Sequence, residues 1–264
     1  MSQPRRASAR LENIFVVDPN PTTAKMLANL VRNLSPWIQV YGSRFADQAF
    51  ALLSQMEPQV IFVEAVGEGF DGMAFVRKLR RSESKCREAP VIMIFGEATA
   101  SQILEARDSG VHELMRRPFT MGDMQKRLDA VTTGRPRDWI EAVEYIGPDR
   151  RRFNSADYKG PRKRRADGPA KTQKMEQALR IVQSAAGAVD SDPVQAARAL
   201  ATQARILIEA AAGQEQYRRL GEAAAVLQTY LQSAASKGLS KDQVEILSAN
   251  LMRAAPPELR AKAA

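Results

Sequence analysis

The chain has 264 residues, of which 44% are hydrophobic and 26% charged, and its formal net charge at pH 7 is +9. This composition is globular, and the length allows one or two domains with hydrophobic cores. One cysteine and one histidine exclude a disulfide framework, a multi-cysteine zinc site and a histidine-rich metal site. No apolar run approaches the roughly 20 residues that cross a bilayer, and no signal-peptide pattern follows the basic tail 1–10. We therefore expect a cytoplasmic protein without a transmembrane segment.

Short apolar runs alternate with amphipathic stretches between residues 11 and 131. The runs Ile14–Val17, Val60–Val63 and Val91–Phe95 are uniformly apolar and too short for helices. Apolar strands separated by helices are typical of a parallel sheet that is covered on both faces. We expect strands near 13–17, 38–42, 59–64, 90–95 and 111–115, and helices near 21–34, 45–56, 72–83, 99–109 and 121–131. This order predicts an α/β domain with the flavodoxin-like (βα)5 fold.

The segment 132–170 is rich in glycine, proline and basic residues, and it predicts a flexible basic linker. It contains a repeat, Tyr145-Ile-Gly-Pro-Asp-Arg-Arg-Arg152 and then Tyr158-Lys-Gly-Pro-Arg-Lys-Arg-Arg165. Arginine forks suit phosphates and tyrosine rings stack on bases, so an anion-binding clamp and a solvated tether are both open interpretations. The anion-binding candidates are Tyr145, Arg150, Arg151, Arg152, Tyr158, Arg162, Lys163, Arg164 and Arg165. Upstream of the repeat, the apolar spacing from Trp139 to Tyr145 predicts a short helix that packs on a neighbouring surface.

The segment 171–258 is alanine-rich and has apolar residues at helical spacing. Asp192-Pro193 and the capping-box pattern Ser240–Gln243 mark helix starts, and Pro256-Pro257 is expected to end the last helix. Four helices with short connections predict a C-terminal all-α bundle. This segment contains no histidine, which excludes a histidine phosphotransfer domain.

Short motifs follow the predicted strands of the α/β region in a fixed order. Val16-Val17-Asp18-Pro19 ends the first strand, and Glu64 ends the third, before Phe70-Asp71-Gly72. Phe95-Gly96-Glu97-Ala98 ends the fourth strand, and Arg117-Pro118-Phe119 follows the fifth. In this order and spacing, residues 11–131 resemble the response-regulator receiver domain (CheY-like) of bacterial two-component systems. The resemblance implies a phosphoacceptor pocket at Asp18, Pro19, Glu64, Phe95 and Arg117.

That pocket departs from the family pattern at four positions. The resemblance places Pro19 where the family has a second acidic residue, and Glu64 where it has the phosphoacceptor aspartate. Phe95 stands in place of a hydroxyl residue and Arg117 in place of lysine. Loss of a carboxylate weakens Mg²⁺ binding, and the longer glutamate displaces the nucleophile. We therefore predict a degenerate pseudo-receiver that is not an enzyme and that holds no metal or cofactor.

The remaining polar residues of the pocket allow two interpretations. Asp18, Glu64 and Arg117 should converge at the carboxyl edge of the sheet, where a Glu64–Arg117 ion pair would form. Such a pair either locks one conformation, because glutamate imitates phosphoaspartate, or is a relic that fills a dead pocket. An atypical receiver that is phosphorylated on Glu64 is a further hypothesis.

Two other reactive side chains have ordinary explanations. His112 is expected at a loop or strand edge. Cys86, between Lys85 and Arg87, is expected to be an ordinary surface thiol, although the two cations would lower its pKa if they were close.

The leading functional hypothesis is a phosphorylation-independent signalling adaptor that binds a protein partner in two-component (phosphorelay) signal transduction. By resemblance, the partner surface would lie near 99–108 and 114–128. The alternative is a protein that binds nucleic acid or a cyclic dinucleotide through the arginine-rich linker, with a steep salt dependence. The oligomeric state is not predicted by the sequence.

Overall fold

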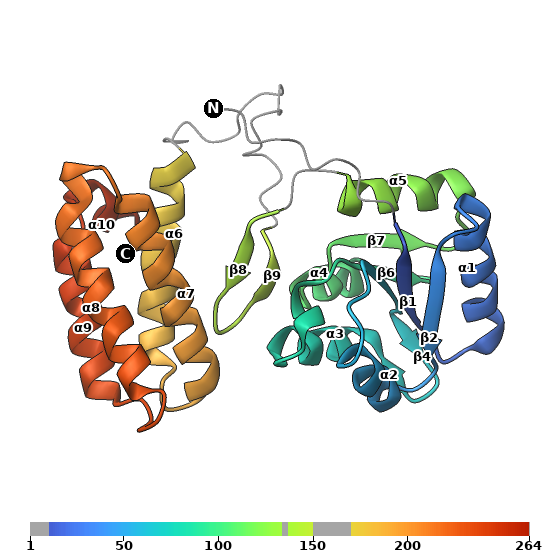
Figure 1. The fold of residues 1–264 in the computed structure, drawn as a ribbon, viewed down its shortest axis with the longest axis horizontal. Helices are drawn as coiled ribbons and strands as arrows, with labels where there is room; N and C mark the ends of the chain where they lie inside the picture. Colours follow the sequence, from blue (N-terminus) through green and yellow to red (C-terminus); the bar gives the residue numbers. More distant parts are fainter. Residues whose placement is uncertain (1–10, 134–136, 150–169, 264) are drawn as a thin grey trace. The chain divides into compact units, whose positions relative to one another are not determined.

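The computed structural model describes residues 11–133, 137–149 and 170–263. They divide into two compact units. Unit 1 contains the described residues up to Ile140 together with Tyr145–Asp149, and unit 2 contains Glu141–Glu144 and the described residues from 170 onward (Figure 1). The predicted basic tail 1–10 and residues 150–169 of the predicted linker lie outside these ranges. None of the described helices combines the length and the apolar character that a bilayer crossing requires.

Unit 1 is built on a five-stranded parallel sheet with the order β2-β1-β3-β6-β7. Its strands are β1 (Asn13–Val17), β2 (Gln39–Ser43), β3 (Val60–Glu64), β6 (Val91–Phe95) and β7 (Glu113–Arg116). In the register of the central strands, Phe15 lies opposite Ile61, and Phe62 lies opposite Ile92. The sheet confirms the predicted flavodoxin-like fold.

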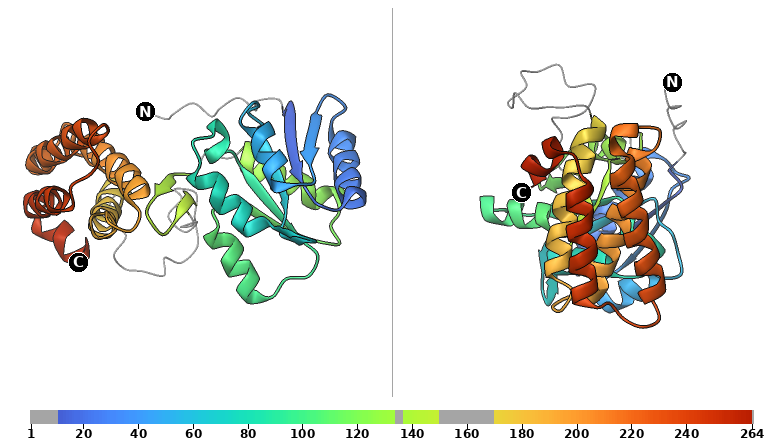
Figure 2. Two further views of the ribbon diagram at one scale, coloured as in Figure 1. Left: turned by 90° about the horizontal axis from the view of Figure 1, so that it is seen from below. Right: turned by 90° about the vertical axis from the view of Figure 1, so that its left-hand side faces the viewer.

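Helices cover both faces of this sheet (Figure 2). They are α1 (Pro21–Leu34), α2 (Ala46–Leu53), α3 (Gly72–Arg81), α4 (Ala100–Asp108) and α5 (Met121–Thr132), with a short 3-10 helix η1 (Lys85–Glu88) after α3. Because side chains alternate along a strand, each strand supplies both cores. Phe15 and Val63 pack with α2 and α3, whereas Ile14 and Phe62 pack with α1 and α5.

Two small antiparallel ribbons were not predicted. β4 (Val66–Gly67) pairs with β5 (Phe70–Asp71) in the loop after β3. The second ribbon joins β8 (Trp139–Glu141) to β9 (Ile146–Pro148). The predicted short helix from Trp139 to Tyr145 is therefore wrong, because this segment pairs as a ribbon that is held by contacts distant in sequence. The Tyr145 hydroxyl donates to the Pro148 carbonyl over 2.8 Å.

A buried arginine holds the second ribbon in unit 1. Arg80 of α3 is 1% exposed and donates to the carbonyls of Gly110, Arg87 and Ala89 over 3.0, 2.5 and 3.0 Å. Its guanidinium lies 5.2 Å from the centre of the Trp139 ring. Gly110 has φ +93°, and a Cβ there would meet the Ile146 carbonyl oxygen at 2.3 Å. The backbones therefore approach so closely that only glycine fits at this position.

Unit 2 is helical, as predicted. It contains α6 (Ala170–Gly187), α7 (Pro193–Ala211), α8 (Arg218–Ala234), α9 (Lys241–Ala254) and α10 (Pro257–Ala263), with a 3-10 turn η3 (Glu215–Tyr217). α7 packs against α6 and α8, and α9 packs against α8 and α6. α9 ends at Ala254, before Pro256-Pro257, as predicted. The short helix α10, which begins at Pro257, was not predicted; proline is favourable at the first helical position.

A buried glutamate is held by glutamine side chains within unit 2. Glu141 and Gln195 are each 2% exposed, and Gln195 Nε2 donates to Glu141 Oε1 over 2.8 Å. Gln203 donates to the Glu141 backbone carbonyl over 2.9 Å. These contacts satisfy polar groups that would otherwise be costly to bury.

Candidate functional site

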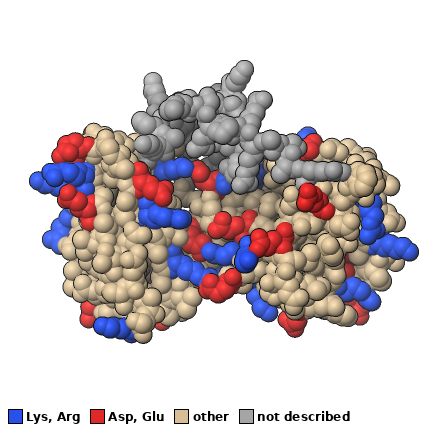
Figure 3. Space-filling view, in the orientation of Figure 1, with Lys and Arg blue, Asp and Glu red and all other residues tan. Residues whose placement is uncertain are grey.

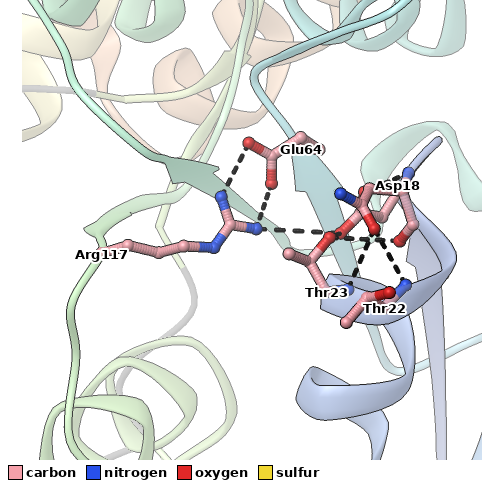
Figure 4. Close-up of polar contacts among 6 residues, drawn as sticks. Asp18, Thr22, Thr23, Glu64 and Arg117 are labelled. Carbon is pink, nitrogen blue, oxygen red and sulfur yellow. Dashed lines mark hydrogen bonds and ion pairs between the residues drawn. The ribbon is translucent and has the colours of Figure 1, made fainter.

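The carboxyl edge of the central sheet brings three predicted site residues together. Asp18 directly follows β1, Glu64 ends β3, and Arg117 directly follows β7. Parallel strands end at the same edge, so residues distant in sequence meet there. Figure 4 shows the Arg117 guanidinium facing both carboxylates. The Arg117–Pro118 peptide bond is cis.

Glu64 and Arg117 form a two-point ion pair. Arg117 Nη1 donates to Glu64 Oε1 over 2.9 Å, and Nη2 donates to Oε2 over 2.5 Å. The Glu64 side chain is 10% exposed and that of Arg117 is 23% exposed, so water screens the pair only in part. Burial raises the pKa of Glu64, and the hydrogen bond to Arg117 opposes this effect. The hydrogen bond to Glu64 raises the pKa of Arg117, which keeps the guanidinium charged at neutral pH.

Asp18 accepts hydrogen bonds from the loop after β1 and from the first turn of α1. Its Oδ1 accepts the Asn20 backbone N–H over 2.9 Å, and its Oδ2 accepts the Thr23 hydroxyl over 2.6 Å. Arg117 Nη2 also lies 3.7 Å from Asp18 Oδ2. Asp18 is 3% exposed, so these contacts provide the partners that a buried carboxylate requires.

Pro19 takes the place where the receiver pattern has a second acidic residue. The backbone of Gly67 packs so closely on the Pro19 ring that a Cβ at Gly67 would meet Pro19 Cγ at 2.2 Å. An apolar ring and a glycine backbone therefore occupy the position where a metal ligand would be needed.

A magnesium ion does not fit these residues. Both Glu64 oxygens bind Arg117, and both Asp18 oxygens accept hydrogen bonds, one from Asn20 and one from Thr23. Within the described ranges, no group of three or more histidine, cysteine, aspartate or glutamate side chains is placed to hold a metal. Magnesium needs oxygen ligands that are free to coordinate, and the residues of this pocket do not supply them.

A cavity of about 880 Å³ opens beside the Glu64–Arg117 pair. The acidic side chains in its lining are Asp18, Asp47, Glu64 and Glu68, and the basic ones are Arg44 and Arg117. The excess of carboxylates disfavours an anion such as a phosphoryl group.

Phe95 lies apart from the other predicted pocket residues. Its side chain is 2% exposed and packs in the core with α2 and α3, and it is not among the residues that line the cavity. The Phe95 backbone contributes nonetheless, because its carbonyl accepts the Arg117 N–H over 2.8 Å.

Of the predicted anion-binding residues, the structure describes Tyr145 alone; Arg150–Arg152, Tyr158 and Arg162–Arg165 lie outside the described ranges. The Tyr145 hydroxyl donates to Pro148, so it helps to close the β8–β9 ribbon.

His112 directly precedes β7, at a strand edge as predicted, whereas Cys86 is more buried than predicted. His112 Nδ1 accepts the Val91 N–H over 3.2 Å and lies 3.4 Å from Arg80 Nη2. Burial lowers the pKa of His112 to about 2. The prediction of a surface thiol is wrong, because Cys86 is 2% exposed and its Sγ donates to the carbonyls of Leu53 and Met56. Burial raises the Cys86 pKa, contrary to the alternative of a lowered one.

Two polar residues of unit 1 were missed by sequence reasoning. The signal for Thr23 was its place in the first turn of α1, from which a hydroxyl can reach back to the residue that ends β1. Arg80 gave no signal, because it stands in the run Arg77-Lys-Leu-Arg-Arg81, which reads as a solvated helix face.

Comparisons with known proteins concern the first half of the chain. The family described as the response regulator receiver domain matches residues 14–129. Chemotaxis protein CheY-3 of Vibrio cholerae is 27% identical over 121 residues, which cover 45% of this chain and 89% of that protein. Chemotaxis protein CheY1 of Helicobacter pylori is 25% identical over 119 residues, which cover 45% of this chain and 94% of that protein.

Among solved structures, Vibrio cholerae chemotaxis protein CheY4 has a TM-score of 0.42 and 19% identity, covering 46% of this chain and 98% of that one. The matched region of the present chain is a receiver domain of the two-component signalling family.

Proposed function

We propose that this chain is a signalling adaptor of a cytoplasmic two-component (phosphorelay) pathway, and that it binds its protein partner without being phosphorylated. The observation that carries the proposal is the two-point ion pair between Glu64 and Arg117 at the phosphoacceptor position. A receiver nucleophile needs a free carboxylate oxygen beside a metal ion. Here both oxygens of Glu64 bind a guanidinium.

The pair also supports a fixed conformation of the pocket. Arg117, which follows β7, contacts Glu64 at the end of β3 and Asp18 after β1, so it joins the ends of three strands of the sheet. We propose that the receiver presents one constant surface, and that the chain acts by binding instead of by catalysis. Glutamate carries the negative charge that phosphorylation would add, which supports an active-like conformation.

The proposed partner surface is formed by α4, β7 and α5, by analogy with the receiver family. Leu104 of α4 is 55% exposed and is an apolar contact point on this surface. An exposed leucine stabilises a complex when the partner removes it from water.

The arginine-rich repeat supports nucleic-acid or cyclic-dinucleotide binding as a second candidate. Its support is the concentration of basic residues between Arg150 and Arg165 in the sequence. On the face drawn in Figure 3, basic and acidic side chains of the described residues are interspersed over each unit. A surface with mixed charge favours binding to a protein over binding to the phosphate backbone of a nucleic acid.

Affinity capture from native lysate separates the two candidates. The baits are the wild-type chain, a variant with Arg150–Arg152 and Arg162–Arg165 changed to alanine, and Leu104→Asp. Val226→Asp is the matched control, because Val226 is 56% exposed but lies on α8. Each capture is run with and without nuclease and with and without a small phosphodonor.

If the chain is an adaptor, the same protein partner should be recovered after nuclease treatment, with the arginine variant, and with or without the phosphodonor. Leu104→Asp should no longer recover it. If Leu104→Asp still recovers the partner, the contact lies on another surface of the chain. Recovery that requires the arginines and disappears with nuclease would favour the second candidate.

A further inference from the structure

Strand β2 is an edge of the central sheet that carries little protection against pairing. Among the described residues it pairs with β1 alone. Gln39, Tyr41 and Gly42 are exposed. The run from Trp37 to Ser43 contains no charged residue and no proline. Exposed edge strands normally carry lysine, proline or a bulge, because an unprotected edge is a template for another strand.

The backbone hydrogen bonds show which groups of β2 face outward. The Gln39 N–H donates to the Glu12 carbonyl over 2.7 Å, and the Ser43 carbonyl accepts the Asp18 N–H over 3.2 Å. In a parallel pair, every second residue bonds to the neighbouring strand. The odd-numbered residues therefore bond to β1, and the N–H and C=O groups of Val40 and Gly42 face away from the sheet.

Three exposed aromatic residues are evenly spaced along the same segment. Trp37 is 68% exposed, Tyr41 47% and Phe45 65%. Tyr41 is the midpoint, with each of the other two four residues away. This spacing is symmetric about Tyr41, so the edge is complementary to a second copy of itself.

We propose that two copies of the chain associate through antiparallel pairing of their β2 strands, with a two-fold axis at Tyr41. In this register, Val40 and the partner's Gly42 exchange two N–H···O=C bonds, as do Gly42 and the partner's Val40. Tyr41 then faces the partner's Tyr41 in the closely spaced, non-hydrogen-bonded pair. Trp37 and Phe45 flank the paired residues of β2, one at each end of the ribbon.

The available apolar area fits a dimer that depends on concentration. Aromatic side chains bury roughly 150–250 Å² each, so the exposed fractions of these three residues on two copies supply on the order of 700 Å². Stable interfaces bury about 1,200–2,000 Å², and the paired backbone and its flanks must supply the remainder. The register also preserves the direction of twist, since the two sheets continue into one.

Cysteine cross-linking tests the register. Residues of a non-hydrogen-bonded antiparallel pair have Cα atoms about 4.5 Å apart, within the range of a disulfide. Full-length Tyr41→Cys should therefore form a covalent dimer under mild oxidation. Trp37→Cys alone should not, because the two copies of that residue would lie at opposite ends of the ribbon. Native Cys86 does not compete, because it is 2% exposed.

Sedimentation equilibrium tests the association without cross-linking. Wild-type protein should dimerise with increasing concentration, and Tyr41→Lys should weaken dimerisation by about tenfold or more, because two like charges would face each other. Leu104→Lys is the matched control and should leave dimerisation unchanged; circular dichroism checks that each variant is folded. The proposal is overturned if the wild type stays monomeric, if Leu104→Lys and not Tyr41→Lys dissociates the dimer, or if Trp37→Cys cross-links as readily as Tyr41→Cys.

Discussion

A double-mutant cycle measures the coupling free energy between Glu64 and Arg117. The cycle uses Glu64→Gln, Arg117→Met and the double variant. Glutamine keeps the size of the side chain and one acceptor oxygen but removes the charge. Methionine keeps much of the arginine stem and removes all donors.

The expected coupling follows from the geometry. Two charges about 4 Å apart attract by about 4 kcal/mol at an effective dielectric constant of about 20. Desolvation of Glu64, seen in its raised pKa, offsets part of this attraction. We expect a net coupling of about 2 kcal/mol, with Arg117→Met alone costing about 3 kcal/mol because it leaves Glu64 buried beside Asp18 without its cation.

Tryptophan fluorescence during urea unfolding measures this coupling in the correct unit. The sequence has two tryptophans, Trp37 and Trp139, and both belong to unit 1. The signal therefore follows the receiver and not the helices of unit 2. A coupling below about 0.5 kcal/mol would refute the reasoning, because it is the value expected for an exposed surface pair.

Three further predictions concern the ribbon and its surroundings. The pKa of His112 is about 2 in the folded state and ordinarily 6.5, so the unfolded state binds the extra proton between these values. Stability of unit 1 should therefore fall by about 1.4 kcal/mol per pH unit below pH 6.5, and urea midpoints measured down to about pH 5 should show no such slope in His112→Gln. Arg80→Met should cost about 3 kcal/mol by the same fluorescence assay, because one buried and two partly buried carbonyls lose their donor. Exposed Arg32→Met should cost less than about 0.5 kcal/mol. Gly110→Ala should lower the melting temperature of unit 1 and increase amide exchange in β9, and an unchanged exchange rate would show that the close approach to Ile146 is not required.

The local sequence pattern was sufficient to predict the strands of the central sheet. The strand predicted at 13–17 is β1 in the structure, and the one predicted near 59–64 is β3. Both are continuous apolar runs buried on two faces, so their pattern does not depend on distant residues. The convergence of Asp18, Glu64 and Arg117 also followed from the sheet alone, because parallel strands end at one edge.

The ribbon could not be predicted because its stability comes from contacts distant in sequence. Trp139 lies over Arg80, and Ile146 packs where Gly110 leaves room. The apolar spacing of that short segment is compatible with a helix or a strand, and only tertiary contacts decide between them. The position of Phe95 was similarly undetermined, since the order of motifs does not say which face of β6 a side chain takes.

Phosphorylation by a small phosphodonor tests the central claim most directly. The wild-type chain and Glu64→Gln are incubated with radiolabelled acetyl phosphate and Mg²⁺ at neutral pH, and incorporated phosphate is measured per mole of protein. We expect no incorporation above the Glu64→Gln control, because Arg117 occupies both oxygens of Glu64 and the pocket lacks free ligands for Mg²⁺. Incorporation that requires Mg²⁺ and is abolished by Glu64→Gln would contradict the account and identify Glu64 as a phosphoacceptor.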